Sequence, residues 1–189
     1  IGAAAACANL LGLDAEGTNH AMGIAATQAA GLKSNFGTMT KPLHAGKAAS
    51  NGLLAASLAS RGFTSRENTL DIAQGFGDSM NEGVKNIDLA LERIGELFHT
   101  QDTLFKYPPA CYGVHAPTEA ALALRLQDGF DPALVEKIEI SVPQNAIGMC
   151  DIPVPSTGLE AKFSLAHNVA LGLLNKADGS LSLYHDETF

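Results

Sequence analysis

The chain has 189 residues, which is enough for one large domain or two modest ones. Its content of 46% hydrophobic and 17% charged residues is typical of a globular chain and excludes a disordered one. The formal net charge of -8 argues against a nucleic acid or an acidic membrane surface as the partner, because both are negatively charged as well.

The first half of the chain, to about Leu97, predicts helices only. The best defined runs over residues 43–60, because Arg61 and Gly62 combine a cation with a left-handed glycine at its end, and Phe63 is the hydrophobic residue that often follows such a cap. The other three are expected over residues 3–11, from an Asn/Thr start after Gly17 to about Gly31, and from Ser65 or Asn68 to Gly75 or Gly77.

The second half of the chain differs in composition. It starts with a long connection that contains prolines. Pro117 then opens a helix that reaches about Gln127, and a last helix is expected over residues 159–174. Between them, residues 136–142 alternate between apolar and polar and predict one strand, ended by Pro143. We therefore predict an α+β chain with a helical domain over residues 1–98 and an α+β domain over residues 99–189.

The three cysteines are odd in number, widely spaced and without a CxxC motif, which indicates reduced thiols in a cytoplasmic protein. They are Cys7, Cys111 and Cys150. No apolar run reaches the roughly 18 residues that span a bilayer, so we expect no membrane segment. Because the chain starts inside a predicted helix and ends without a cap, we expect it to be part of a longer one.

Lys41 stands at the predicted start of the third helix, where the backbone dipole favours negative charge. Pro42 suits the first helical position and pushes Lys41 out of the helical region, so the free N–H groups and the ammonium together predict an anion site. His44 faces the same opening. The alternative is a solvated surface lysine, and the local chemistry leaves both open.

The body of this helix carries small residues at spacings of four and three, which places them on one face. They are Ala45, Ala49, Gly52, Ala56 and Ala59. Such a stripe lets another helix approach closely, either within the fold or across a dimer. We assign it to packing and give it no chemical role.

Three stretches of the sequence resemble the MmgE/PrpD family, which includes 2-methylcitrate dehydratases, cis-aconitate decarboxylases and an iminodisuccinate epimerase. They are "KPLHAGKAASNGLLAASLASRGF", "FKYPPACYGVHAPTEAAL" and "PSTGLEAKFSLAHNVALGLL". The resemblance covers essentially the whole chain in the same order. It implies part of a helical domain followed by part of a smaller α+β lid domain, a homodimer formed through the helical domain, and further pocket residues upstream of Ile1.

The resemblance also implies reactions on small di- and tricarboxylates without a metal or an organic cofactor. Lys41 and Lys106 match the family's two carboxylate-binding lysines, and fixed cations of this kind would stabilise the carbanion that forms next to a carboxylate. Cys111 matches a pocket-lining position. We expect His44 to orient the substrate or Lys41.

His115 precedes Pro117 at a helix start, which disfavours an imidazolium ion and favours a neutral ring that accepts a proton. A cap or hinge histidine is the alternative, and both stay open. Cys111 and His115 have a spacing that zinc sites use, but no second pair accompanies them, so we expect no metal. The remaining basic candidates are interpreted as surface or boundary residues: Lys47, His20, His99, His167 and His185.

The favoured function is therefore a lyase that dehydrates a 2-hydroxy acid such as 2-methylcitrate. A decarboxylase or epimerase on a related polyacid would use the same residues, although the loop over residues 144–155 has no tyrosine or other obvious acid where a family decarboxylase places one. The alternative from another class is a truncated, catalytically silent helical module that acts by self-association. The enzyme hypothesis requires that Lys41 and Lys106 converge on one cleft between the two domains, with His115 nearby.

Overall fold

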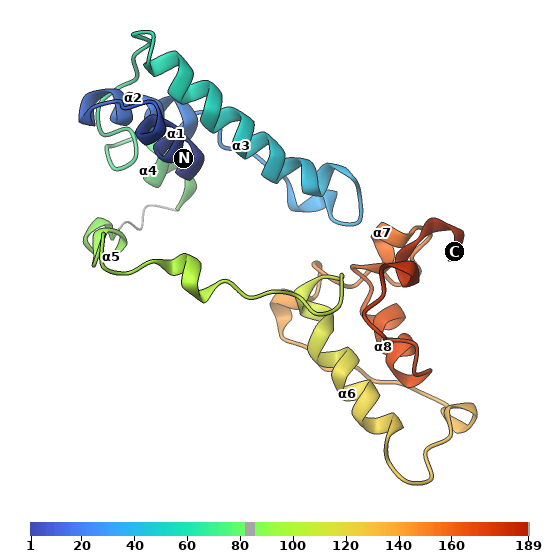
Figure 1. The fold of residues 1–189 in the computed structure, drawn as a ribbon. Helices are drawn as coiled ribbons and strands as arrows, with labels where there is room; N and C mark the ends of the chain where they lie inside the picture. The colour runs from blue at the N-terminus through green and yellow to red at the C-terminus, as the bar shows by residue number, and fades with distance from the viewer. Residues whose placement is uncertain (82–85, 189) are drawn as a thin grey trace. The chain divides into compact units, whose positions relative to one another are not determined.

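The structure, a computed structural model, describes residues 1–81 and 86–188, and these residues are mostly helical (Figure 1). The chain divides into two compact units. Unit 1 comprises Ile1–Gly31 and Pro42–Thr103, and unit 2 comprises Leu32–Lys41 and the chain from Leu104 onward. Residues 82–85, in the region predicted as helical, lie outside the described residues. The domain boundary between residues 98 and 99 stays a prediction.

Unit 1 contains α1 (Gly2–Leu10), α2 (Ala15–Ala26), most of α3 (Thr40–Ala59), α4 (Phe76–Met80) and α5 (Ile87–Leu91). Its core consists mainly of alanines from the first three helices, joined by the side chain of Ile24. Small side chains bring α1 and α3 close together: a Cβ atom at Gly52 would lie 2.5 Å from Ala3 Cβ and 2.8 Å from the backbone of Ala3 and Ala4. The small-residue stripe therefore packs within the fold at this point.

The two ends of α3 differ in how well the sequence predicted them. The C-terminal cap is confirmed, because Gly62 has a φ of 81°, Phe63 N–H donates to the Leu58 carbonyl at 3.1 Å, and Gly62 N–H donates to the Ala59 carbonyl at 2.9 Å. The predicted start was wrong. The helix begins at Thr40, so Lys41 lies in its first turn, and proline is tolerated there because the first N–H groups need no helical partner.

The predicted boundaries of the neighbouring helices also need correction. Asp14 caps α2 by accepting from Gly17 N–H at 2.8 Å, so the helix starts earlier than predicted and ends at Ala26. The helix predicted from Ser65 is replaced by turns, since Asn68 and Gln74 adopt left-handed φ angles of 54° and 61° that a right-handed helix excludes. α4 begins only after this turn region.

Unit 2 is built around α6 (His115–Arg125) and α8 (Leu165–Leu173), with the short α7 (Gly158–Ala161) preceding α8 (Figure 1). The two longer helices pack closely, because a Cβ atom at Gly172 would lie 2.9 Å from Ala121 Cβ. The last predicted helix is split in two, since Ser164 caps α8 by accepting from His167 N–H at 3.2 Å. Short 3-10 turns connect these elements: η1 (Lys33–Asn35), η3 (Tyr112–Val114), η4 (Pro132–Leu134), η5 (Gln144–Ala146), η6 (Leu181–Tyr184) and η7 (Asp186–Thr188), with η2 (His99–Asp102) in unit 1.

The strand predicted over residues 136–142 is not found in the structure. Among the described residues, the only β pairing is one antiparallel bridge between Asp151 and Ser164. Alternation predicts which side chains face the core, but a strand forms only when a second segment pairs with it. The helical part of the predicted fold class is confirmed, whereas the α+β character of the second domain is not.

The C-terminal segment is fixed to α7 and α8 through Tyr184. Its hydroxyl donates to Asn168 Oδ1 at 2.6 Å, and Asn168 Nδ2 donates to the carbonyls of Ala161 and Ser164, both at 2.8 Å. A Cβ atom at Gly158 would lie 1.7 Å from the Tyr184 carbonyl oxygen. Glycine is therefore required where the segment crosses the start of α7.

Candidate functional site

Lys41 is brought to unit 2 by the short segment that precedes α3. Within this segment the Phe36 ring stacks on the Phe163 ring, with centroids 5.3 Å apart and an interplanar angle of 9°. Gly37 is buried against Glu160, where a Cβ atom would lie 3.2 Å from Glu160 Cγ. Lys41 Nζ lies 6.0 Å from the centroid of the same Phe163 ring, at the outer range of a cation–π contact. Phe163 thus contacts both the segment and the cation that it carries.

The backbone around Lys41 offers less to an anion than the sequence predicted. Lys41 N–H donates to the Thr38 carbonyl at 3.2 Å, and Pro42 has no N–H group. Two of the N–H groups expected at this helix start are therefore missing from the predicted anion site. The exposed ammonium of Lys41 is the group that remains available for a carboxylate.

Lys106 is held in unit 2 by a hydrogen bond to the backbone of Ala110. Its ammonium donates to the Ala110 carbonyl at 3.2 Å, and the next residue, Cys111, donates its N–H to the Lys162 carbonyl at 2.9 Å. Lys162 is the neighbour of Phe163. Lys41 therefore lies near Phe163, and Lys106 is bonded to Ala110. The hydrogen bond from Cys111 N–H to the Lys162 carbonyl joins the two segments that contain Ala110 and Phe163.

Two thiols lie beside Lys106. Cys150 donates a hydrogen bond to Cys111 with the sulfur atoms 3.1 Å apart, and Cys150 is fully buried while Cys111 is half-buried. The pKa of the Cys150 thiol is raised to about 12, first by burial and then by the hydrogen bond and charge of Cys111 and the charge of Asp151, while the Lys106 charge lowers it. Cys150 is therefore a neutral thiol at physiological pH.

His115 is the first residue of α6, one position into the helix that it was predicted to precede. Its ring lies 5.2 Å from the Tyr112 ring, centroid to centroid. Its Nε2 atom is buried and has no hydrogen-bond partner among the described residues. No protein group among the described residues therefore competes for this nitrogen.

His44 belongs to unit 1, whereas Lys41, Lys106 and His115 belong to unit 2. The ring is half-buried and packs over Gly31, where a Cβ atom would lie 3.3 Å from His44 Nδ1. Gly31 has a φ of 138°, which only glycine adopts readily. The role of His44 in orienting Lys41 or the substrate stays a prediction.

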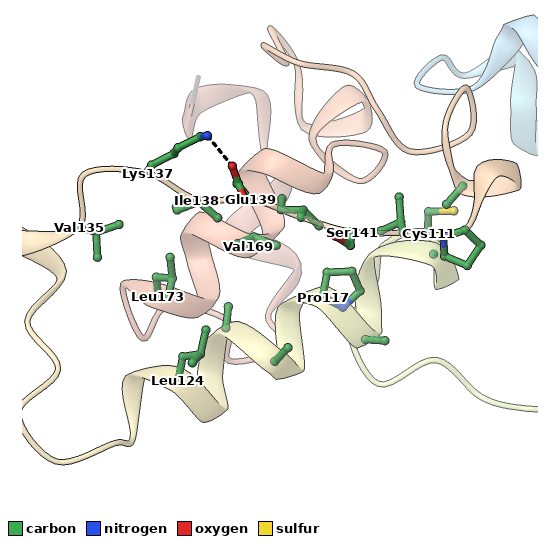
Figure 2. Close-up of a pocket in the computed structure, with 18 of the residues that line it drawn as sticks. Cys111, Pro117, Leu124, Val135, Lys137, Ile138, Glu139, Ser141, Val169 and Leu173 are labelled. Atoms are coloured by element: carbon green, nitrogen blue, oxygen red, sulfur yellow. Dashed lines mark hydrogen bonds and ion pairs between the residues drawn. The ribbon is translucent and has the colours of Figure 1, made fainter.

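A large pocket of about 820 Å³ lies next to the cysteines and is mostly apolar (Figure 2). Figure 2 shows α6 and α8 as two of its walls, the segment with Val135 and Ile138 passing over them, and Cys111 at one end. Its two charged lining residues, Lys137 and Glu139, pair with each other. The rest of the lining is uncharged, and the Lys106 ammonium is bonded to the carbonyl of Ala110, which directly precedes Cys111.

Sequence reasoning missed the roles of Phe36 and Cys150. His167, expected at the surface or boundary, is half-buried, and burial lowers its pKa; its ring lies 6.3 Å from the Tyr184 ring. No local signal pointed to Phe36 or Cys150, because each acts through a partner more than 35 residues away in the chain. Phe163, Cys111 and Cys150 each belonged to a stretch singled out in advance, but the pairing with a distant partner did not follow from those stretches.

The described residues contain no group of three or more His, Cys, Asp or Glu side chains arranged to hold a metal ion. In the same part of the chain, no helix has both the length and the apolar composition needed to cross a membrane.

Comparisons with known proteins match both halves of the chain. The sequence model described as the MmgE/PrpD N-terminal domain matches residues 1–87, and the MmgE/PrpD C-terminal domain matches residues 109–188. Cis-aconitate decarboxylases are similar: the human protein is 29% identical over 98% of this chain, the mouse protein 31% over 97%, and that of Aspergillus terreus 29% over 92%. The chain spans 38–39% of the length of these relatives. With both domain models matched in order, the chain belongs to the MmgE/PrpD family.

Proposed function

We propose that this chain is part of a lyase that acts on a small di- or tricarboxylate. The observation that carries the proposal is that Lys41 and Lys106 belong to one compact unit. Lys41 lies near the Phe163 ring, and the segment of Lys106 is joined to the neighbouring Lys162 by the hydrogen bond from Cys111 N–H. Two ammonium groups in one unit suit a ligand with more than one carboxylate. The charge of -8 on the whole chain makes such local cations necessary for an anionic ligand.

The proposed chemistry uses the two lysines for binding and His115 for proton transfer. A carboxylate held by an ammonium group withdraws electrons from its neighbouring carbon, and the same ammonium stabilises the negative charge that develops when the proton leaves. In this proposal His115 Nε2 accepts that proton, since no protein group among the described residues competes for it. In a 2-hydroxy acid such as 2-methylcitrate, loss of the hydroxyl group as water completes the dehydration.

Decarboxylation is the second candidate reaction, and the curated relatives named cis-aconitate decarboxylase favour it. Here the bond to one carboxyl group breaks, CO2 leaves, and the electron pair that remains on carbon takes up a proton. Lys41, Lys106 and His115 would serve this reaction equally well. The loop over residues 144–155, which lacks a tyrosine, is the feature of this sequence that favours dehydration instead.

Isothermal calorimetry with citrate tests the binding part of the proposal. We expect saturable binding by the chain, with affinity reduced about tenfold or more in Lys41→Ala and in Lys106→Ala, because each loses one charge-assisted contact. Lys47→Ala is the matched control, since Lys47 is an exposed lysine on the same helix as Lys41. Equal affinity in all four proteins would contradict the proposed site.

Proton NMR of the reaction mixture distinguishes the two reactions. Incubation with 2-methylcitrate yields an unsaturated tricarboxylate if the chain dehydrates, whereas incubation with cis-aconitate yields CO2 and a dicarboxylate if it decarboxylates. His115→Gln should lower either rate strongly while leaving citrate binding nearly unchanged. Binding without either product, or no binding at all, would favour the alternative of a silent module that acts by self-association. The homodimer and the cytoplasmic location expected from the sequence remain part of this proposal.

A further inference from the structure

The pair formed by Cys111 and Cys150 has no role in the chemistry proposed above. The two sulfur atoms are 3.1 Å apart, about 1 Å more than the length of a disulfide bond. Both residues are anchored by their backbones near the junction of α7 and α8. Cys111 N–H donates to the carbonyl of Lys162, just after α7, at 2.9 Å, and the N–H of Leu165, the first residue of α8, donates to the Cys150 carbonyl at 2.8 Å. These two backbone hydrogen bonds therefore hold the two thiols close to each other.

We propose that Cys111 and Cys150 form a redox modification site, at which a small peroxide converts the two thiols reversibly into a disulfide. The two residues differ in access as such a site requires. Cys111 is half-buried and lines one end of the apolar pocket, so an oxidant can reach it (Figure 2). Cys150 is fully buried in the core of unit 2, and the sulfur of Cys111 is its hydrogen-bond partner. Cys111 is the attacking sulfur and Cys150 the resolving one.

The reaction balances with the peroxide as the only oxidant. The Cys111 thiolate attacks one peroxide oxygen, the O–O bond breaks, and the sulfur becomes a sulfenic acid while hydroxide leaves and is protonated to water. The Cys150 sulfur then attacks the Cys111 sulfur, the S–O bond breaks, and the leaving hydroxide takes the Cys150 proton as a second water. Two thiols lose two electrons in total, and one peroxide gains them.

The consequence for ligand binding rests on the proposed function. Lys106 is held by the carbonyl of Ala110, which directly precedes Cys111. A shift of Cys111 toward Cys150 by about 1 Å displaces this carbonyl and with it the Lys106 ammonium. We expect the oxidised chain to bind citrate at least about threefold more weakly than the reduced chain, and reduction by dithiothreitol to restore the affinity.

Peptide mapping after oxidation tests the modification itself. The chain is treated with hydrogen peroxide, its remaining thiols are alkylated, and it is digested with trypsin. We expect peptides 107–125 and 138–162, which contain the two cysteines, to be joined by a dithiothreitol-sensitive bond, while the free thiols fall from three to one. Closing this loop should also raise Tm by about 5 °C.

Two variants control the experiment. Cys7→Ser should keep the cross-link, because Cys7 lies in unit 1, and Cys111→Ser, at a half-buried position, should abolish it without unfolding the chain. A Cys111 sulfinic acid beside an unmodified Cys150 thiol, or a cross-link that requires Cys7, would overturn the proposal. A disulfide that forms without changing citrate affinity overturns only the effect on binding. A chain that binds no citrate in either state overturns the proposed function, and the peptide map still decides the modification.

Discussion

At the scale of single residues, Phe163 contacts both Phe36 and Lys41. One face of the ring meets Phe36, the cation of Lys41 lies near it, and its backbone is adjacent to the hydrogen bond between Cys111 and Lys162. An aromatic residue suits this place because it packs and attracts a cation with the same ring. The position of Lys41 therefore depends on hydrophobic contacts made several residues before it.

Replacing Phe36 with leucine should show this dependence. Phe36→Leu removes the stacked ring, and we expect the free energy of unfolding to fall by about 1 kcal/mol or more. Urea unfolding followed by circular dichroism measures the change. The matched control is Phe105→Leu, because Phe105 is 95% exposed and its replacement should change stability by less than about 0.5 kcal/mol. Equal effects of the two changes would contradict the stacking role.

His167 gives the chain a dependence of stability on pH. Because burial lowers the pKa of this side chain in the folded state, the unfolded state binds its proton more readily. The contribution is fully present above the unfolded pKa of about 6.5 and is lost as the pH falls through the lower folded value. Thermal unfolding between pH 7.5 and pH 5 should show a smaller fall of Tm in His167→Gln than in the original chain. Parallel Tm curves would rule out this contribution.

At the scale of elements, the contact of α1 with α3 depends on Gly52, which has no side chain. Gly52→Ala would place a Cβ atom 2.8 Å from backbone atoms of Ala3 and Ala4, which cannot rotate away. We expect a loss of about 1–3 kcal/mol in urea unfolding. The control is Gly46→Ala on the same helix, where nothing lies within 4 Å and alanine should stabilise by about 0.5–1 kcal/mol. A stabilising Gly52→Ala would show that the helices are not in this contact.

The elements also show what the sequence was able to predict. The cap formed by Arg61, Gly62 and Phe63 is set by neighbouring residues, so its pattern predicted it correctly. The strand over residues 136–142 depends on a partner far away in the chain, and local alternation cannot supply one. The same limit applies to the site: the sequence allowed single residues such as Lys106 and His115 to be proposed, but it did not predict the pairing of Cys111 with Cys150.

Hydrogen exchange checks the state of residues 136–142 directly. The backbone N–H groups of this stretch make no backbone hydrogen bond among the described residues, so we expect them to exchange within seconds at neutral pH. Amides in the middle of α6 should exchange at least about a hundredfold more slowly. Mass spectrometry of peptic peptides measures both. Slow exchange over residues 136–142 would show that the segment is paired as a strand in solution.

At the scale of the whole molecule, self-association depends on the small-residue stripe on α3. Gly52 and Ala56 are buried, but Ala45 and Ala49 are exposed, and Leu53 next to them is 57% exposed. This exposed half of the stripe is available to a second copy.

Sedimentation measures this self-association. We expect the chain to form dimers at micromolar concentration, above its monomer mass of 19.6 kDa, and Leu53→Glu to shift the population to monomers because a charge enters the apolar contact. Leu126→Glu is the control, since Leu126 is 84% exposed at the end of α6 in unit 2. Monomers at all concentrations, or equal effects of both changes, would contradict a dimer through α3.

The close approach of the Tyr184 carbonyl to Gly158 constrains which residues related chains can carry at this position. Any side chain at position 158 would occupy the space of that oxygen, so the two segments can meet in this way only while position 158 remains glycine. A related chain that acquired another residue there must route its end differently and give up the bond between the Tyr184 hydroxyl and Asn168. Glycine at 158, tyrosine at 184 and asparagine at 168 should therefore be inherited together or lost together.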